Sequence, residues 1–78
     1  MKILVENNTG LIKYQNYDFI YKDDYVEIYD YNLLKYRDFS LTPNNSTIYE
    51  IDNIIEDFVG NKFIYDDGDV LLNPNFEE

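Results

Sequence analysis

The chain has 78 residues, with 16 acidic and six basic side chains and a formal net charge of −10 at pH 7. This length allows one domain with a modest core, and a hydrophobic content of 45 % is too high for a disordered tail. Cysteine and histidine are absent, which excludes disulfides, thiolate metal sites and Cys–His or Ser–His catalysis.

Residues 1–6 contain only three consecutive aliphatic side chains before an acid, which is too short for a signal peptide. Nothing further along the chain approaches the length of a membrane span. The absence of cysteine fits a reducing compartment. We therefore expect a cytoplasmic location, in an infected or host bacterial cell.

The first 14 residues predict a β-hairpin. Residues 2–6 read as a strand, and residues 7–10 (Asn-Asn-Thr-Gly) are a strong turn signal because Asn and Gly tolerate positive φ. Residues 11–14 are expected to return as the antiparallel partner strand.

Residues 18–31 predict a second hairpin, because they are rich in aromatic and β-branched side chains. We expect strands at Phe19–Tyr21 and Tyr25–Tyr31, and residues 33–41 favour a further strand over a helical turn. Strand alternation places Val26 and Ile28 on the core face. The opposite face of that strand would carry Tyr25, Glu27, Tyr29 and Tyr31.

Residues 48–59 predict an α-helix. Thr47 and Glu50 fit a capping box, in which the two side chains satisfy unpaired backbone amides reciprocally. Gly60 follows where a left-handed cap would end the helix. The apolar side chains with helical spacing are Ile48, Ile51, Ile54, Ile55, Phe58 and Val59.

Residues 62–65 and 70–72 flank Asp66-Asp67-Gly68-Asp69, which predicts a C-terminal hairpin. A calcium loop is the alternative interpretation of these aspartates, but the alternating ligand spacing and the distal Glu are missing. The expected fold class is α+β: one acidic domain over residues 1–78, with a small antiparallel sheet packed against the helix at 48–59.

No catalytic group stands out. Ser40 and Ser46 have no evident base nearby, and each glycine occupies a turn or cap position rather than a phosphate-binding loop. Among 16 scattered acids, some pair always resembles the carboxylates of a hydrolase by chance. We therefore expect a binding protein without a cofactor or metal, and not an enzyme.

The acids are unevenly distributed. Residues 50–78 contain nine acids and one base, whereas residues 1–49 contain seven acids and five bases. Like charges on one helix side reduce stability, and a surface that tolerates this often serves a basic partner. A solvated helix face with ordinary solubilising charge is the alternative. The predicted partner-binding acids are Glu50, Asp52, Glu56, Asp57, Asp66, Asp67 and Asp69.

Tyrosine is the second signal: nine occur, seven of them between positions 14 and 36. Tyrosine is enriched at protein interfaces because it offers large contact area with little entropy loss. We predict Tyr25, Tyr29 and Tyr31 as anchors. The alternative is that tyrosine replaces larger apolar residues in a chain biased towards Asn, Asp, Ile and Tyr and devoid of alanine, as an AT-rich genome would produce.

In size, acidity and compositional bias the chain resembles the small phage-encoded inhibitors known as anti-CRISPR proteins and nucleic-acid mimics. The resemblance implies a stoichiometric inhibitor that binds a basic, nucleic-acid-binding surface of a bacterial defence effector. An immunity protein or antitoxin against a basic nuclease toxin would present the same surface. A self-associating phage structural or assembly protein, such as a homodimer, is the other alternative. Direct binding to nucleic acid is disfavoured by the repulsive charge.

Overall fold

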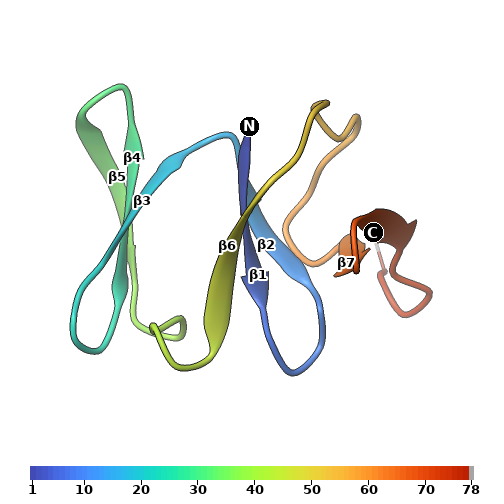
Figure 1. Ribbon diagram of the computed structural model, residues 1–78, viewed down its shortest axis with the longest axis horizontal. Coiled ribbons are helices and arrows are strands. Elements are labelled where there is room, and N and C mark those ends of the chain that lie inside the picture. Colours follow the sequence, from blue (N-terminus) through green and yellow to red (C-terminus); the bar gives the residue numbers. More distant parts are fainter. Residues whose placement is uncertain (78) are drawn as a thin grey trace.

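The computed structural model describes residues 1–77, and these residues form eight β-strands and no helix. The strands make three antiparallel sheets with the orders β2-β1-β6, β3-β4-β5 and β7-β8. The three lie side by side, with β2-β1-β6 in the middle (Figure 1). The strands are β1 (Lys2–Glu6), β2 (Ile12–Gln15), β3 (Asp18–Tyr21), β4 (Val26–Asp30), β5 (Leu33–Asp38), β6 (Ser46–Glu50), β7 (Phe63–Asp66) and β8 (Asp69–Leu72).

The three predicted hairpins are confirmed as β1–β2, β3–β4 and β7–β8. The strand favoured within residues 33–41 forms as β5, which ends at Asp38. The β7–β8 turn has positive φ at Asp67 (49°) and Gly68 (94°), as a two-residue primed turn requires. The Cα radius of gyration is 12.0 Å, so the domain is compact. Within residues 1–77 there is no helix that could span a membrane.

The helix expected at residues 48–59 does not form, and the expected α+β class is wrong because the domain is all-β. The residues that would begin the helix lie in β6, which pairs antiparallel with all five residues of β1. The capping box is absent as well. The Thr47 hydroxyl donates to Asn7 Oδ1 at 2.7 Å, and the Glu50 carboxylate accepts from the Met1 amine.

Residues 51–62 instead form an irregular segment that lies across the middle sheet. Their apolar spacing reflects contacts of Ile51, Ile55 and Phe58 with the sheet, whereas Ile54 and Val59 are 55 % and 51 % exposed. Asp, Asn and β-branched residues dominate the segment, so its intrinsic helix propensity is low. The preceding residues gain a full β-ladder by pairing with the second edge of β1.

Two backbone conformations in this segment also oppose a helix. Asp57 has a φ of 56°, in the left-handed region, which interrupts the predicted helix near its end. The expected cap at Gly60 is wrong as well: there is no helix for it to end, and it is Asn61 (φ 74°), not Gly60, that adopts the left-handed conformation. A Cβ at Gly60 would come within 3.1 Å of the Lys13 carbonyl oxygen, so the glycine serves close backbone packing.

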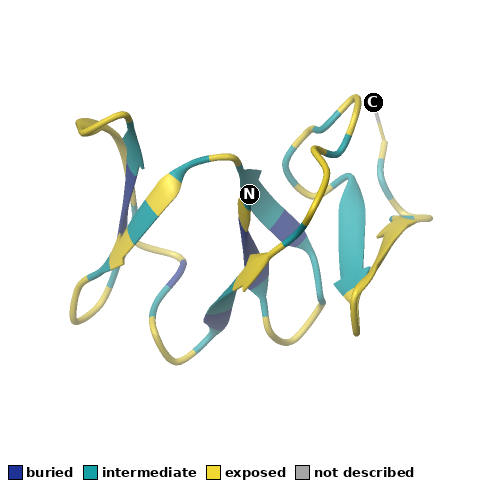
Figure 2. Cartoon of the chain, turned by 45° about the horizontal axis from the view of Figure 1, so that its top comes forward, coloured by how far each residue is buried: buried dark blue, intermediate teal, exposed yellow. Residues whose placement is uncertain are grey.

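The middle sheet is buried on both faces. Side chains of β1 alternate between the faces, so the uninterrupted run Ile3-Leu4-Val5 supplies two cores rather than one. The dark buried residues of Figure 2 therefore concentrate in this sheet and in β4. The first core contains Leu4, Val26, Ile28 and Leu41, and the second contains Ile3, Val5 and Ile12.

A β-bulge at Lys13 lets β2 contribute to both cores. Leu4 pairs with Tyr14 and Val5 with Ile12, so Lys13 has no direct partner in the ladder. In an unbroken ladder Ile12 and Tyr14 would share one face. The bulge instead buries Ile12 completely in the second core and leaves Tyr14 packed against the first.

Candidate functional site

Six of the predicted acids are exposed on one layer of the molecule. We define the acidic layer as residues 51–72, which comprise the irregular segment and the β7–β8 hairpin and cover the second core. The layer contains six acids and one base. Among the described residues none of these carboxylates forms an ion pair. They are Asp52, Glu56, Asp57, Asp66, Asp67 and Asp69.

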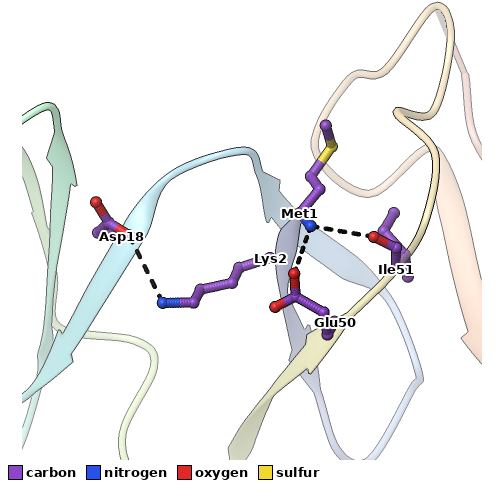
Figure 3. Close-up of polar contacts among 5 residues, drawn as sticks. All are labelled: Met1, Lys2, Asp18, Glu50 and Ile51. Carbon is purple, nitrogen blue, oxygen red and sulfur yellow. Dashed lines mark hydrogen bonds and ion pairs between the residues drawn. The ribbon is translucent and has the colours of Figure 1, made fainter.

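Glu50, the seventh predicted acid, has an internal partner. Its Oε1 accepts a hydrogen bond from the Met1 amine at 2.5 Å, and the same amine donates to the Ile51 carbonyl at 3.1 Å (Figure 3). Nearby, Lys2 Nζ lies 3.6 Å from Asp18 Oδ1. The hydrogen bond from the amine holds the pKa of Glu50 below its ordinary value. Glu50 therefore joins β6 to β1 instead of extending the acidic layer.

The three predicted tyrosines differ in their contacts and in their exposure. Tyr25 stacks on Phe39 with ring centroids 4.6 Å apart, and the Tyr29 hydroxyl donates to Glu27 Oε1 at 2.9 Å. Tyr31 is 90 % exposed and lies in the β4–β5 turn with φ 48°. Only Tyr31 thus presents most of its ring to solvent.

Glu27 is buried (7 % exposed) although its strand face was predicted to be exposed. Its carboxylate lies 3.6 Å from Lys22 Nζ and 3.4 Å from Arg37 Nε. The pKa of Glu27 is lowered mainly by the hydrogen bond from Tyr29. Burial opposes this effect, but the hydrogen bond and the two cations together outweigh it. This cluster therefore ties β4 to β5 and to the β3–β4 turn.

A groove on the surface was not predicted from the sequence. It is an open groove of about 1070 Å³ between β2, β5 and the acidic layer. Three tyrosines from outside the predicted set line it, together with carboxylates from both sides. The residues that matter to its chemistry are Lys13, Tyr14, Tyr17, Tyr36, Asp38, Glu56 and Asp57.

The three tyrosines of the groove form one aromatic cluster. The ring centroid of Tyr36 lies 6.0 Å from Tyr14 and 6.3 Å from Tyr17, and Tyr14 lies 6.5 Å from Tyr17. Tyr17 meets both other rings nearly edge-on, an arrangement that aromatic pairs favour. Tyr36 is 51 % exposed. The high density of tyrosine between positions 14 and 36 indicated an aromatic cluster. Which tyrosines belong to it depends on how two sheets pack, and the sequence does not show this.

A hydrogen-bond relay fixes one wall of the groove. The Tyr14 hydroxyl donates to Asp38 Oδ2 at 2.7 Å, while Asp38 Oδ1 accepts from the Ser40 amide and hydroxyl. Burial and the bond to Asp38 raise the pKa of Tyr14, so its phenol stays protonated. Burial also opposes ionisation of Asp38, but the hydrogen bonds from Ser40 and Tyr14 outweigh it and lower the pKa of Asp38. The wall therefore carries a fixed negative charge.

The acidic layer is held along β2 by side-chain and backbone bonds. Gln15 Nε2 donates to the Ile55 carbonyl at 2.9 Å, and Ile55 N donates to Gln15 Oε1 at 2.8 Å. Asn61 N donates to the Ile12 carbonyl, and Lys13 Nζ donates to Asn61 Oδ1 at 2.7 Å. These contacts cover the edge of β2 and set the second wall of the groove, which carries Glu56 and Asp57.

The groove suits a cationic guest better than an anionic one. Its lining carries three carboxylates and one ammonium, so its net charge is −2. Aromatic faces also attract cations. Within residues 1–77 no group of three His, Cys, Asp or Glu side chains is arranged to hold a metal ion.

No family model, no curated protein and no solved structure matches this chain. Its function has to be inferred from its own surface, in which an acidic layer adjoins a tyrosine-lined groove.

Proposed function

We propose that this protein is a stoichiometric inhibitor that docks its acidic layer onto a basic, nucleic-acid-binding surface of another protein, a bacterial defence effector. The observation that supports the proposal most directly is that six exposed carboxylates lie on one layer and form no ion pair among the described residues. Carboxylates on this layer would take the positions that phosphates occupy on the partner.

The negative charge of the β7–β8 hairpin reduces the stability of the hairpin itself. Asp66 and Asp69 are direct cross-strand partners, and Asp67 lies in the turn between them. Like charges that face each other across a strand pair destabilise it. A binding role for the negative potential at this end of the molecule would account for the arrangement.

The charge also favours a protein partner over nucleic acid itself. A net charge of −10 repels phosphate backbones. The lining of the tyrosine groove is also net negative, so it does not offset this repulsion. The same field accelerates association with a basic protein and makes the rate depend on ionic strength. Defence effectors that bind nucleic acid act in the cytoplasm, which is the location we propose.

Affinity capture with matched variants tests this proposal. The bait is the protein itself, in bacterial lysate at low salt, and its counterpart carries Asp66→Asn, Asp67→Asn and Asp69→Asn. A control bait with Asp23→Asn, Asp24→Asn and Asp30→Asn loses the same charge from the β3-β4-β5 sheet. We expect a basic nucleic-acid-binding protein on the wild-type and control baits, released by added DNA or RNA and reduced on the hairpin variant. Equal recovery on the hairpin and control variants, or no basic protein on any bait, would contradict the proposal.

Self-association is the second candidate function. Strands β5 and β8 lie at sheet edges and are exposed along almost their whole length. Leu33 and Leu72 on these strands are 65 % and 63 % exposed, and apolar side chains on sheet edges promote pairing between chains. Sedimentation at increasing protein concentration separates the two candidates, because a strict monomer contradicts self-association.

A further inference from the structure

The tyrosine groove has a composition that the acidic layer alone does not explain. It is lined by an aromatic cluster on β2 and β5 and by Glu56 and Asp57 from the acidic layer. The opposite wall carries the ionised Asp38, whose negative charge the hydrogen bonds from Tyr14 and Ser40 stabilise. Carboxylates thus border the aromatic rings on both sides.

We infer that this groove binds an arginine-bearing segment of the partner protein, with the guanidinium stacked on the half-exposed ring of Tyr36. This inference rests on the proposed function and names the chemistry of one contact within it. A guanidinium is planar and weakly hydrated, so it stacks on aromatic rings while donating to carboxylates in its own plane. The groove supplies both elements.

The dimensions of the groove agree with a peptide segment rather than a single side chain. About 1070 Å³ lies just above the usual range for small-molecule sites, and the groove is open to solvent. The polar side chains of Gln15 and Asn61 at the groove are engaged in bonds within the protein. The free binding capacity therefore consists mainly of the tyrosine rings and the carboxylates, which selects a cation.

Lys13 also lines the groove and would repel a guest cation. Its ammonium group is held at the Asn61 side by the 2.7 Å bond to Asn61 Oδ1, next to the bulge of β2. With this charge included the lining still has a net charge of −2, so the groove attracts cations.

The test uses a short capped peptide of alternating glycine and arginine, and the same peptide with neutral citrulline instead of arginine. Two-dimensional NMR of the full chain at low salt reports the binding site through the tyrosine ring signals and the backbone amides. We expect the arginine peptide to shift the Tyr14, Tyr17 and Tyr36 ring signals, and the citrulline peptide to shift none of them.

Two variants locate the contact. Tyr36→Leu keeps an apolar side chain at a half-exposed position, and we expect it to raise the Kd of the arginine peptide about tenfold. Glu56→Gln with Asp57→Asn should weaken binding more than Asp66→Asn with Asp67→Asn, which removes the same charge from the hairpin turn. Asparagine also tolerates the left-handed φ that Asp57 and Asp67 adopt.

The outcomes separate this inference from the proposed function. Shifts confined to the β7–β8 hairpin, or equal Kd values for the wild type and Tyr36→Leu, would overturn the groove inference and leave the acidic layer as the contact. Equal binding of the arginine and citrulline peptides would also overturn it. No shift anywhere with the arginine peptide would count against both.

Discussion

Gln15 and Ile55 are 40 positions apart in sequence, yet the side-chain amide of Gln15 makes both a donated and an accepted hydrogen bond with the backbone of Ile55. The pair reproduces the exchange of bonds between neighbouring strands, with a side chain in place of one backbone. It fastens the irregular part of the acidic layer to the edge of β2, and both residues line the groove.

Replacing Gln15 with Met should release this segment. The substitution keeps the length of the side chain but leaves two partly buried backbone groups of Ile55 unpaired, which should lower the free energy of unfolding by about 1–3 kcal/mol. Urea unfolding measures the loss, and hydrogen exchange should show faster exchange of the Ile55 amide. An unchanged exchange rate at Ile55 would show that other contacts hold the segment.

The neighbouring isoleucines distinguish the observed segment from the predicted helix. The helical pattern assigned both Ile54 and Ile55 to an apolar stripe, but Ile54 is 55 % exposed and Ile55 packs against the second core. We expect Ile55→Ala to destabilise the fold by about 1–3 kcal/mol and Ile54→Ala by less than about 0.5 kcal/mol. Chemical denaturation of both variants is the measurement. Equal losses, together with a helical far-UV circular dichroism spectrum, would support the helix instead.

The sequence predicted the strands well because their signals are local. The turn residues Asp67 and Gly68 specify a tight hairpin, and the alternation around Val26 and Ile28 specifies the buried face of β4. The helix prediction for residues 48–59 was wrong because apolar side chains at every third or fourth position are also compatible with an irregular segment that packs across a sheet. The structure of residues 46–50 is decided by a tertiary contact: they pair as β6 with the edge of β1 that β2 leaves open.

The candidate site was predictable only in part. Exposure of the acids follows from their charge, and six of the seven predicted acids are exposed within the acidic layer. The groove depends on a bulge at Lys13 that directs Tyr14 towards β5. No local sequence pattern predicts that bulge. Strand alternation places Glu27 on an exposed face, and its burial could not be predicted because the cations that pair with it come from the β3–β4 turn and from β5.

Glu27 should make stability depend on pH. Its folded-state pKa lies below the ordinary value of 4.5, so the ionised carboxylate stabilises the fold above that value, and this contribution is lost as pH falls through the folded pKa. Glu27→Gln should therefore lower the thermal midpoint at pH 7, and its difference from the wild type should shrink towards pH 3. Comparing the two proteins at each pH removes the contribution of the other acids. A difference that does not change with pH would mean that Glu27 acts through packing alone.

Tyr31 and Asn32 form the β4–β5 turn, with φ values of 48° and 72°. Tyrosine is a poor residue for the left-handed region, and at 90 % exposure it contributes little burial. Tyr31→Asn should thus stabilise the domain by about 0.5 kcal/mol, whereas Asn32→Ala should destabilise it by about 1 kcal/mol. Urea unfolding of the pair tests both signs. Loss of stability in Tyr31→Asn would show that the tyrosine ring packs in solution.

The cross-strand pair of Asp66 and Asp69 should have opposite effects on stability and on binding: its repulsion destabilises the hairpin, whereas its charge favours association with a basic partner. Asp69→Lys replaces a like-charge pair with an opposite-charge pair, so it should stabilise the hairpin by about 0.2–1 kcal/mol. The same change reverses a charge of the acidic layer, so association with a basic partner should slow and its salt dependence should flatten. Urea unfolding measures the first effect and stopped-flow association the second, with Asp23→Lys as the control on the β3–β4 turn. Stabilisation with an unchanged association rate would mean that the hairpin lies outside the interface, whereas slowing equal to that of Asp23→Lys would assign the effect to net charge alone.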